Sequence, residues 1–282
     1  MKETTLLDLT VDVSFKYYFT SQGSEEILAH FLSVALDLPL DEFSEIEVLN
    51  PILPKENIQD KDFIVDIKLK TKRGKTMHIE MQFQDHKNFA ERVVAYNGRI
   101  FGSQIKRGDD YTELKEVYSI VITNFDMFPH TPHYRDVFKY TGKYGDILTD
   151  LTQIHILQLP KLPKDSKTPL EYWLKLFKIN KEEDLEMIAE KAPGMDKAIR
   201  HLRVLSADEM AKQLEEERLS GISLRKTLEN TARNEGRVEG RVEGRIEGRV
   251  EALYKDMGLS TEEIAKKLNV DEDYIIELIK EI

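Results

Sequence analysis

The stretch FIVDIKLKTKRGKTMHIEMQFQ, residues 63–84, decides the fold because apolar and polar side chains alternate on both sides of a turn. The apolar positions are Phe63, Val65, Ile67 and Leu69 before the turn, and Met77, Ile79, Met81 and Phe83 after it. A period of two predicts two β-strands. The run TKRGK between them, with Gly74 suited to a left-handed conformation, predicts the turn of a β-hairpin.

Two carboxylates and an amide fall on the other face of this hairpin. If the hairpin pivots on Arg73, Asp66 and Glu80 are equally far from the pivot and face each other. Gln82 then points the same way as Glu80. Opposed residues place their Cβ atoms about 4.5–5.5 Å apart, where two carboxylates repel unless a cation lies between them. We therefore expect a Mg²⁺ site, because Mg²⁺ prefers one or two carboxylates together with water and phosphate oxygens.

Such a site predicts the hydrolysis of phosphodiesters, because bound Mg²⁺ acidifies a water nucleophile and stabilises charge on the phosphate. Gln82 would orient that water or contact the phosphate, since an amide both donates and accepts hydrogen bonds. The same alternation is also typical of a half-exposed hairpin whose charged face only meets solvent. A shift of one residue in register would place Asp66 and Glu80 on opposite faces.

The hairpin residues resemble a known nuclease pattern. Asp66, followed after the turn by Glu80 and Gln82 in HIEMQFQ, resembles the D…(D/E)-x-K pattern of the PD-(D/E)XK nuclease superfamily. It resembles more closely the Rpn family of recombination-promoting nucleases and transposase-like proteins. The resemblance covers roughly residues 8–180.

Segments outside the hairpin share this resemblance. Residues 12–16 (DVSFK) resemble the family's first-helix motif. Arg92-x-x-x-Tyr96 resembles its following helix, and residues 114–125 resemble the next strand. The Glu-Gly-Arg repeats near the C-terminus are also similar to those of family members.

The resemblance implies an α/β fold with a restriction-endonuclease-like core, a mixed central sheet flanked by helices, followed here by a long helical C-terminal tail. It implies a Mg²⁺-dependent DNA endonuclease, a hydrolase acting on phosphodiester bonds, linked to recombination or mobile elements. By carry-over, Asp66 and Glu80 would be the metal ligands. Gln82 would replace the superfamily's lysine as the third catalytic residue.

Two departures follow from that carry-over. Gln82 is neutral, so another residue would have to supply the positive charge, and Lys16 and Lys68 are candidates. Lys68 lies on the expected face of the site. The superfamily often has an acidic residue on its first helix, for which Asp12 is the nearest match. Asp12 is equally interpretable as the N-cap of a short helix over residues 13–20.

A polar stripe predicts a DNA-binding helix after the hairpin. Residues 88–107 have helical spacing, and steps of four and three place Arg92, Tyr96, Arg99, Ser103 and Lys106 on one face. Basic side chains with an aromatic among them suit a phosphate backbone. An exposed amphipathic helix would show the same spacing.

The chain divides by composition into three expected parts. Residues 1–205 form the nuclease-like domain with a helical extension. Residues 206–257 are highly charged and contain four Glu-Gly-Arg triplets, which begin at Glu235, Glu239, Glu243 and Glu247. We expect this segment to be a helical stalk that makes a homo-oligomer, with a flexible charged linker as the alternative. Residues 258–282 form a small helical unit that begins with a capping box of Ser260 and Glu263.

Composition narrows the class of protein. The chain has 282 residues, of which 40% are hydrophobic and 33% charged, so it has the material for a core. It contains no cysteine, which excludes disulfides, a thiol nucleophile and thiolate zinc sites. No apolar run approaches the roughly 20 residues of a membrane span, and we expect a cytoplasmic location without membrane contact.

Three functions compete at this point. The first is the metal-dependent endonuclease. The second is a non-catalytic DNA-binding or regulatory oligomer that keeps the nuclease fold, and the third is a purely structural oligomer. The net charge of −11 is unlike that of a protein that only coats DNA. The set Asp66, Glu80 and Gln82 favours the first function over the third.

Overall fold

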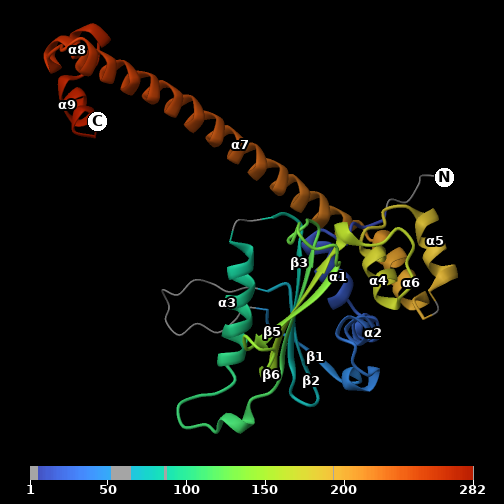
Figure 1. The fold of residues 1–282 in the computed structure, drawn as a ribbon. Coiled ribbons are helices and arrows are strands. Elements are labelled where there is room, and N and C mark those ends of the chain that lie inside the picture. Colours follow the sequence, from blue (N-terminus) through green and yellow to red (C-terminus); the bar gives the residue numbers. More distant parts are fainter. Residues whose placement is uncertain (1–5, 52–64, 86–87, 193, 282) are drawn as a thin grey trace. The chain divides into compact units, whose positions relative to one another are not determined.

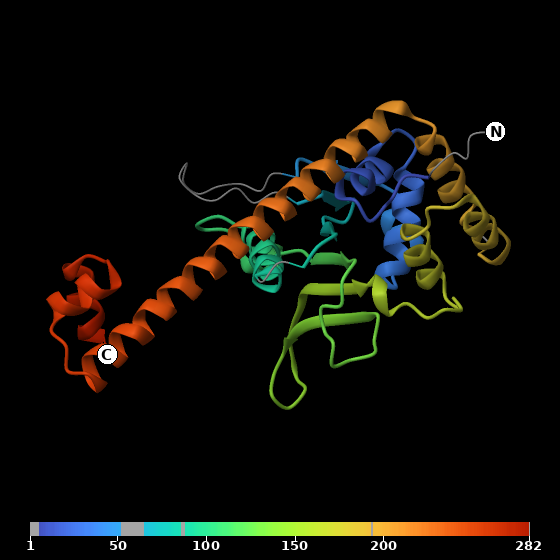
Figure 2. The same ribbon diagram turned by 90° about the horizontal axis from the view of Figure 1, so that it is seen from above.

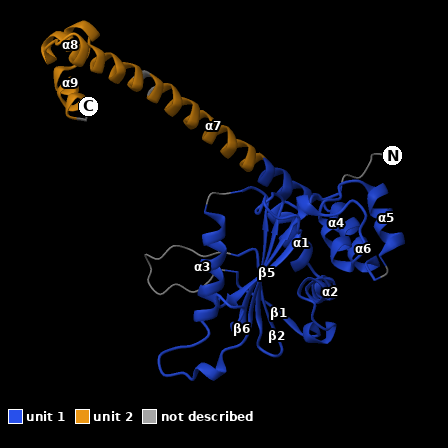
Figure 3. Cartoon of the chain, in the orientation of Figure 1, with its two compact units in different colours: residues 1–219 blue, residues 220–282 orange. Residues whose placement is uncertain are grey.

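The computed structural model describes residues 6–51, 65–85, 88–192 and 194–281. The chain divides into two compact units, residues 1–219 and residues 220–282 (Figure 3). The first unit contains a six-stranded sheet with helices on both faces (Figure 1). The expectation of a mixed sheet flanked by helices is confirmed.

The sheet has a parallel centre and antiparallel edges. In spatial order its strands are β1 (Ile46–Leu49), β2 (Ile67–Thr71), β3 (Thr76–Gln82), β4 (Val117–Thr123), β6 (Ile147–Gln158) and β5 (Arg135–Thr141). β3, β4 and β6 run parallel to one another, whereas β1, β2 and β3 are joined antiparallel and β5 is antiparallel to β6. β3 therefore lies inside the sheet and is buried along its whole length.

The β2–β3 hairpin has the predicted register. Ile67 pairs with Ile79, and Lys68 pairs with His78, so the pairs are symmetric about Arg73. Gly74 has a φ of +87°, a left-handed conformation that glycine adopts without steric cost. The turn and its pivot are thus confirmed. β2 begins directly after Asp66, and the expected strand residues Phe63 and Ile64 lie outside the described residues.

Helices cover the two faces unequally, as Figure 1 and Figure 2 show. Among the described residues, the helix on one face is α3, Phe89–Gly102. The other side carries α1 (Asp12–Thr20), α2 (Glu25–Leu36), α4 (Pro169–Phe177), α5 (Glu182–Lys191) and α6 (Asp196–Ser206). Short 3-10 turns occur at Leu40–Phe43, Tyr111–Glu113 and Leu159–Lys161.

The main core lies between the sheet and this larger group of helices. Met77, Ile79 and Met81 of β3 point into it. Phe19 and Trp173 lie in an aromatic cluster in which most ring pairs meet edge to face or tilted. One face of β3 packs into this core, so the side chains at the alternate positions of β3 point towards α3.

Two elements differ from the sequence prediction. β5 was not expected, because it is an edge strand with mostly exposed side chains and so lacks a buried apolar alternation. The helix expected over residues 88–107 ends at Gly102. Gly98 and Gly102 weaken its C-terminal half, and Lys106 consequently lies in the loop that follows.

Helix α7, Glu209–Glu251, is 43 residues long, and the boundary between the units falls inside it at Leu219. In the second unit, a π-helical turn at Ala252–Asp256 leads to α8 (Thr261–Leu268) and α9 (Glu272–Glu281). The predicted capping box of Ser260 and Glu263 is present. A small core includes Val250, Leu253, Ile264, Ile275 and Leu278. No helix in the described part of the chain is long and apolar enough to cross a membrane.

Candidate metal-binding active site

Asp66 and Glu80 meet on the face of the sheet that α3 covers. The hairpin register, continued by one residue, places Asp66 opposite Glu80. The Oδ2 atom of Asp66 accepts a hydrogen bond of 2.7 Å from the backbone N–H of Met81, which fixes its side chain against β3. Glu80 is only 8% exposed, so the alternative of a solvated hairpin face is wrong.

The two carboxylates perturb each other. Burial, followed by the negative charge of Glu80, raises the pKa of Asp66 well above its ordinary value. Burial raises the pKa of Glu80 to about 7, although the guanidinium of Arg92 lowers it. Two buried acids at one place hold protons more tightly than free acids, because a second negative charge is costly in a desolvated site. A cation would remove that cost.

Arg92 of α3 reaches both β3 residues of the site. Its Nη2 atom donates to Glu80 Oε1 at 2.8 Å and also to Gln82 Oε1. Its guanidinium lies 5.0 Å from the ring centroid of Phe89 and 5.9 Å from that of Tyr96. The amide nitrogen of Gln82 donates to the backbone carbonyl of its neighbour two residues along, at 2.7 Å.

The site contains buried hydrogen-bonding atoms that have no partner. Among the described residues these include Glu80 Oε2 and Arg92 Nε. Leaving such atoms unsatisfied costs about 1–3 kcal/mol each, and more for a charged group. A buried carboxylate oxygen without a partner, close to a second carboxylate, is the type of atom that binds a divalent cation, so the residues present fit such an ion.

The protein supplies few ligands of its own. No group of three or more His, Asp or Glu side chains in the described residues is close enough together to hold a metal. Asp66 and Glu80 are therefore the carboxylates available at this place. That number fits Mg²⁺, which usually keeps several waters and completes its shell with substrate phosphates.

A buried polar chain supports the site from behind. The amide of Asn97 in α3 donates to Ser119 Oγ at 2.7 Å and accepts from Thr152 Oγ1 at 2.5 Å. Ser119 Oγ in turn contacts His78 Nδ1 at 3.1 Å. Burial lowers the pKa of His78 to about 3, so its ring is neutral. This chain joins α3 to β3, β4 and β6 and thereby fixes the helix that carries Arg92.

Asp12 is brought near the site by α1, but not as a helix cap. The N-cap of α1 is Val11, so the N-cap interpretation of Asp12 is wrong. Its carboxylate instead forms a bidentate ion pair with Arg218 of α7, with Nη2–Oδ2 at 2.6 Å and Nε–Oδ1 at 2.7 Å. The charge of Asp12 raises the pKa of both Asp66 and Glu80, which places it in the electrostatic range of the pair.

The start of α7 is docked on α1 through further polar contacts. Glu215 Oε1 accepts from the backbone N–H of Asp8 at 2.7 Å and from Ser14 Oγ at 3.0 Å. Tyr17 donates to Asp208 Oδ2 at 2.9 Å. Sequence reasoning missed this joint, because its partners lie about 200 residues apart in the chain and carry no local signal.

The remaining predicted residues lie at different distances from the carboxylates. Lys68 lies opposite His78, two pairs further along the hairpin, and burial lowers its pKa. Lys16 is exposed on α1. Arg99 lies two turns along α3 from Arg92. Because α3 ends at Gly102, the interpretation of Lys106 as part of this helical stripe is wrong.

Several basic residues at the turn of the β2–β3 hairpin form ion pairs with acidic neighbours. Lys72 pairs with Glu45, and Arg73 pairs with Glu42. Lys75 pairs with Glu42 at 3.2 Å. These charges are consequently less available to an external phosphate.

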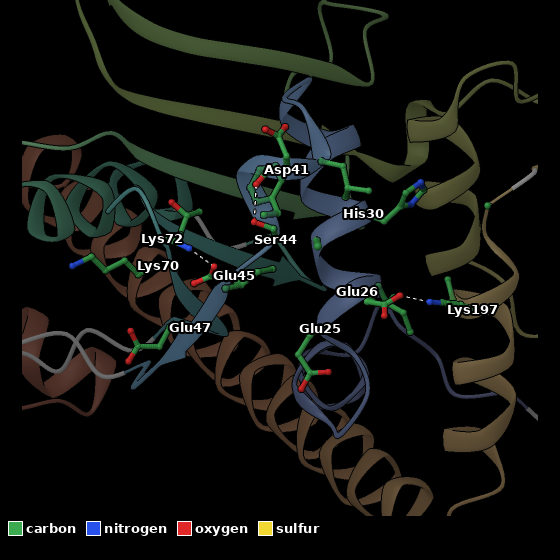
Figure 4. Close-up of a pocket in the computed structure, with 18 of the residues that line it drawn as sticks. Glu25, Glu26, His30, Asp41, Ser44, Glu45, Glu47, Lys70, Lys72 and Lys197 are labelled. Atoms are coloured by element: carbon green, nitrogen blue, oxygen red, sulfur yellow. Dashed lines mark hydrogen bonds and ion pairs between the residues drawn. The ribbon is translucent and has the colours of Figure 1, made fainter.

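A separate cavity of about 990 Å³ lies on the side of the larger helix group (Figure 4). It is lined by parts of α2, β1 and α6, and its rim includes Glu26 paired with Lys197. His30 accepts a hydrogen bond of 3.0 Å from the indole N–H of Trp173 there. None of the predicted site residues lines this cavity.

A comparison with protein families identifies the domain. A family model described as PD-(D/E)XK nuclease family transposase matches residues 9–225. The matched span begins before α1, includes the whole sheet and ends within α7, beyond Arg218. No curated protein and no solved structure matches the chain.

Proposed function

The chain belongs to the PD-(D/E)XK nuclease family transposases, and on this premise we propose that it is a Mg²⁺-dependent DNA endonuclease that hydrolyses phosphodiester bonds. The observation that supports the proposal most is the pair of the half-buried Asp66 and the buried Glu80, with Glu80 Oε2 lacking a partner. A link to recombination or mobile elements follows from the transposase description of the family.

Asp66 and Glu80 would hold the metal. A bound Mg²⁺ ion supplies an acidified water and neutralises charge on the phosphate. Asp66 is oriented by the Met81 N–H, and Glu80 is oriented by Arg92. Because both acids have raised pKa values without a cation, they release protons to bind one, and ion binding strengthens as the pH rises.

In this proposal, α3 would bind the DNA backbone next to Asp66 and Glu80. Arg92 contacts Glu80, Tyr96 lies next to the guanidinium of Arg92, and Arg99 continues the same helix. Arginine side chains neutralise phosphates and fix the register of a protein on DNA without reading its sequence. Lys106, in the loop after α3, would extend this contact.

A second candidate function is a DNA-binding or regulatory protein that keeps the nuclease fold. One observation favours it, namely that a neutral residue, Gln82, occupies the third position of the motif. In this case the carboxylate pair would be a remnant, and the chain would bind DNA without cutting it.

We also propose that residues 220–282 mediate self-association while residues 1–219 carry the chemistry, in a cytoplasmic protein. Along α7, a Cβ added at Gly236, Gly240, Gly244 or Gly248 would meet no atom within 4 Å beyond its chain neighbours and the adjoining helix backbone. Val238 is 61% exposed on the same helix. A helix with an open glycine stripe allows a second helix to approach closely. Sedimentation of the full chain, compared with a chain ending at Arg225, tests this part.

The cleavage of supercoiled plasmid in Mg²⁺ tests the proposed function. We expect metal-dependent nicking by the native chain and loss of nicking in Asp66→Ala and Glu80→Ala. Glu47→Ala, which removes an exposed carboxylate of β1, is the matched control and should cleave normally. Circular dichroism of each variant checks the fold. Binding of the plasmid without nicking by the native chain would favour the second candidate.

A further inference from the structure

Building on the proposed endonuclease function, we infer that Arg92 is the cationic group of the site and contacts the phosphate that is cleaved. Gln82, in this assignment, is the residue that positions Arg92. Negative charge that develops on a phosphate during cleavage needs preorganised positive charge or donors beside it. A neutral amide does not supply that charge, so the structure must supply it elsewhere.

The hydrogen bonds of Gln82 are directed into the protein. Its Oε1 atom accepts from Arg92, and its Nε2 atom donates to the backbone carbonyl of Gln84 at 2.7 Å. The residue is only 9% exposed. Gln82 therefore holds the guanidinium in place, with its amide orientation fixed by the Gln84 carbonyl.

Arg92 has more hydrogen-bond donors than its contacts with Glu80 and Gln82 use. A guanidinium has five N–H donors, and its contacts with Glu80 and Gln82 both use Nη2. Its Nε is buried without a partner, yet 31% of the side chain remains exposed. The guanidinium is thus held by Glu80 and Gln82 through Nη2, while part of the side chain remains accessible to a substrate. Its planar fork matches two phosphate oxygens.

Aromatic contacts fix the direction of Arg92. Phe89, one turn before it on α3, and Tyr96, one turn after it, lie within 6 Å of its guanidinium carbon, at 5.0 Å and 5.9 Å. Such cation–π contacts stabilise a guanidinium and limit its rotamers. Arg92 is therefore oriented before a substrate arrives, which is what electrostatic stabilisation of a transition state requires.

The other basic residues near the site are less suited to this role. Lys68 lies opposite His78, whose pKa its charge lowers, and it is two pairs away from the carboxylates. Lys16 is exposed on α1. Arg218 is engaged by both oxygens of Asp12. Arg92 is the arginine that contacts a site carboxylate directly.

Kinetics of plasmid nicking by the full chain test this inference. Arg92→Ala should lower kcat about 100-fold or more with little change in KM, because the lost contact is made mainly in the transition state. Arg92→Lys should retain an intermediate rate, since it keeps the charge without the planar fork. Arg107→Ala, an exposed arginine in the loop after α3, is the control and should have the native rate.

A double variant that moves the positive charge from α3 to β3 distinguishes a catalytic role of Arg92 from a structural one. In the double variant Arg92→Ala with Gln82→Lys, a lysine on β3 should restore at least about tenfold of the lost rate, as a charge delivered from the neighbouring position would. A readout without turnover is the affinity for Mn²⁺. Arg92→Ala leaves Asp66 and Glu80 in place and should still bind Mn²⁺, which a disrupted site would not do.

The outcomes distinguish this inference from the function on which it rests. If the native chain nicks DNA and Arg92→Ala nicks at the same rate, the role of Arg92 is overturned while the endonuclease stands. If Arg92→Ala is slow and neither Arg92→Lys nor the double variant recovers any activity, Arg92 has only a structural role. If the native chain does not nick DNA under any metal condition, both proposals fall.

Discussion

Two carboxylate–arginine pairs near the site differ in how completely they are satisfied. In the pair of Asp12 and Arg218, the guanidinium covers both carboxylate oxygens, and the side chains are 26% and 44% exposed. In the pair of Glu80 and Arg92, the side chains are 10% and 31% exposed, and one oxygen and one N–H are buried without partners. A complete pair joins two helices, whereas an incomplete buried pair costs stability and retains capacity for a ligand.

The largest expected effect compares these carboxylates in catalysis. Glu80→Gln should reduce plasmid nicking about 1,000-fold or more, because it removes a proposed metal ligand. Asp12→Asn should reduce it about tenfold to 100-fold at most, as the loss of a group outside the ligand shell does. Initial rates at saturating Mg²⁺ measure both. Equal losses in the two variants would remove the distinction between the pairs.

The next effect is the pH dependence of stability in the metal-free protein. The folded-state pKa of Glu80, about 7, lies above its ordinary value. Its contribution is therefore fully present at pH 4 and is lost as the pH rises through 7. Urea unfolding should show the native chain losing on the order of 3 kcal/mol relative to Glu80→Gln between pH 4 and pH 8. Asp66 acts in the same direction.

The control for this titration is Glu47→Gln, which changes an exposed carboxylate of β1. It should keep the native pH dependence. If Glu80→Gln and Glu47→Gln follow the same curve, Glu80 is not a buried acid with a raised pKa. The incomplete pair of Glu80 and Arg92 thus predicts that the free energy of unfolding depends on pH differently in the two variants.

The sequence predicted the hairpin part of the site well. Alternation and the position of Gly74 determine the register, and the register determines that Asp66 faces Glu80. The family resemblance added the same residues and the surrounding fold. These features depend on neighbours within about fifteen residues, which pattern analysis sees directly.

The arginine partners of the two carboxylates could not be predicted from such local patterns. Arg92 was placed on a DNA-binding stripe, but how α3 is rotated on the sheet depends on its packing and on the chain from Asn97 to Ser119. Arg218 is separated from Asp12 by 206 positions. β5 was missed because an exposed edge strand carries little periodic apolar signal.

The smallest expected effect concerns the complete pair. Arg218→Ala should destabilise the first unit by only about 0.5 kcal/mol, because the pair is partly exposed and solvent screens it. Hydrogen exchange in the first turns of α7 should nevertheless quicken. Arg225→Ala, which removes an exposed pair with Glu229 further along α7, is the matched control and should leave those turns unchanged. Equal exchange in both variants would show that Arg218 does not anchor the helix.

Calorimetric titration with Mn²⁺ tests the central claim most directly, because Mn²⁺ takes the same carboxylate and water ligands as Mg²⁺. The account predicts binding by the native chain at pH 8, weaker binding at pH 6, and a loss of about 100-fold in affinity in Glu80→Gln. Asp12→Asn should bind with nearly native affinity. Unchanged Mn²⁺ affinity in Glu80→Gln, or no binding by the native chain at pH 8, would contradict a metal site at Asp66 and Glu80.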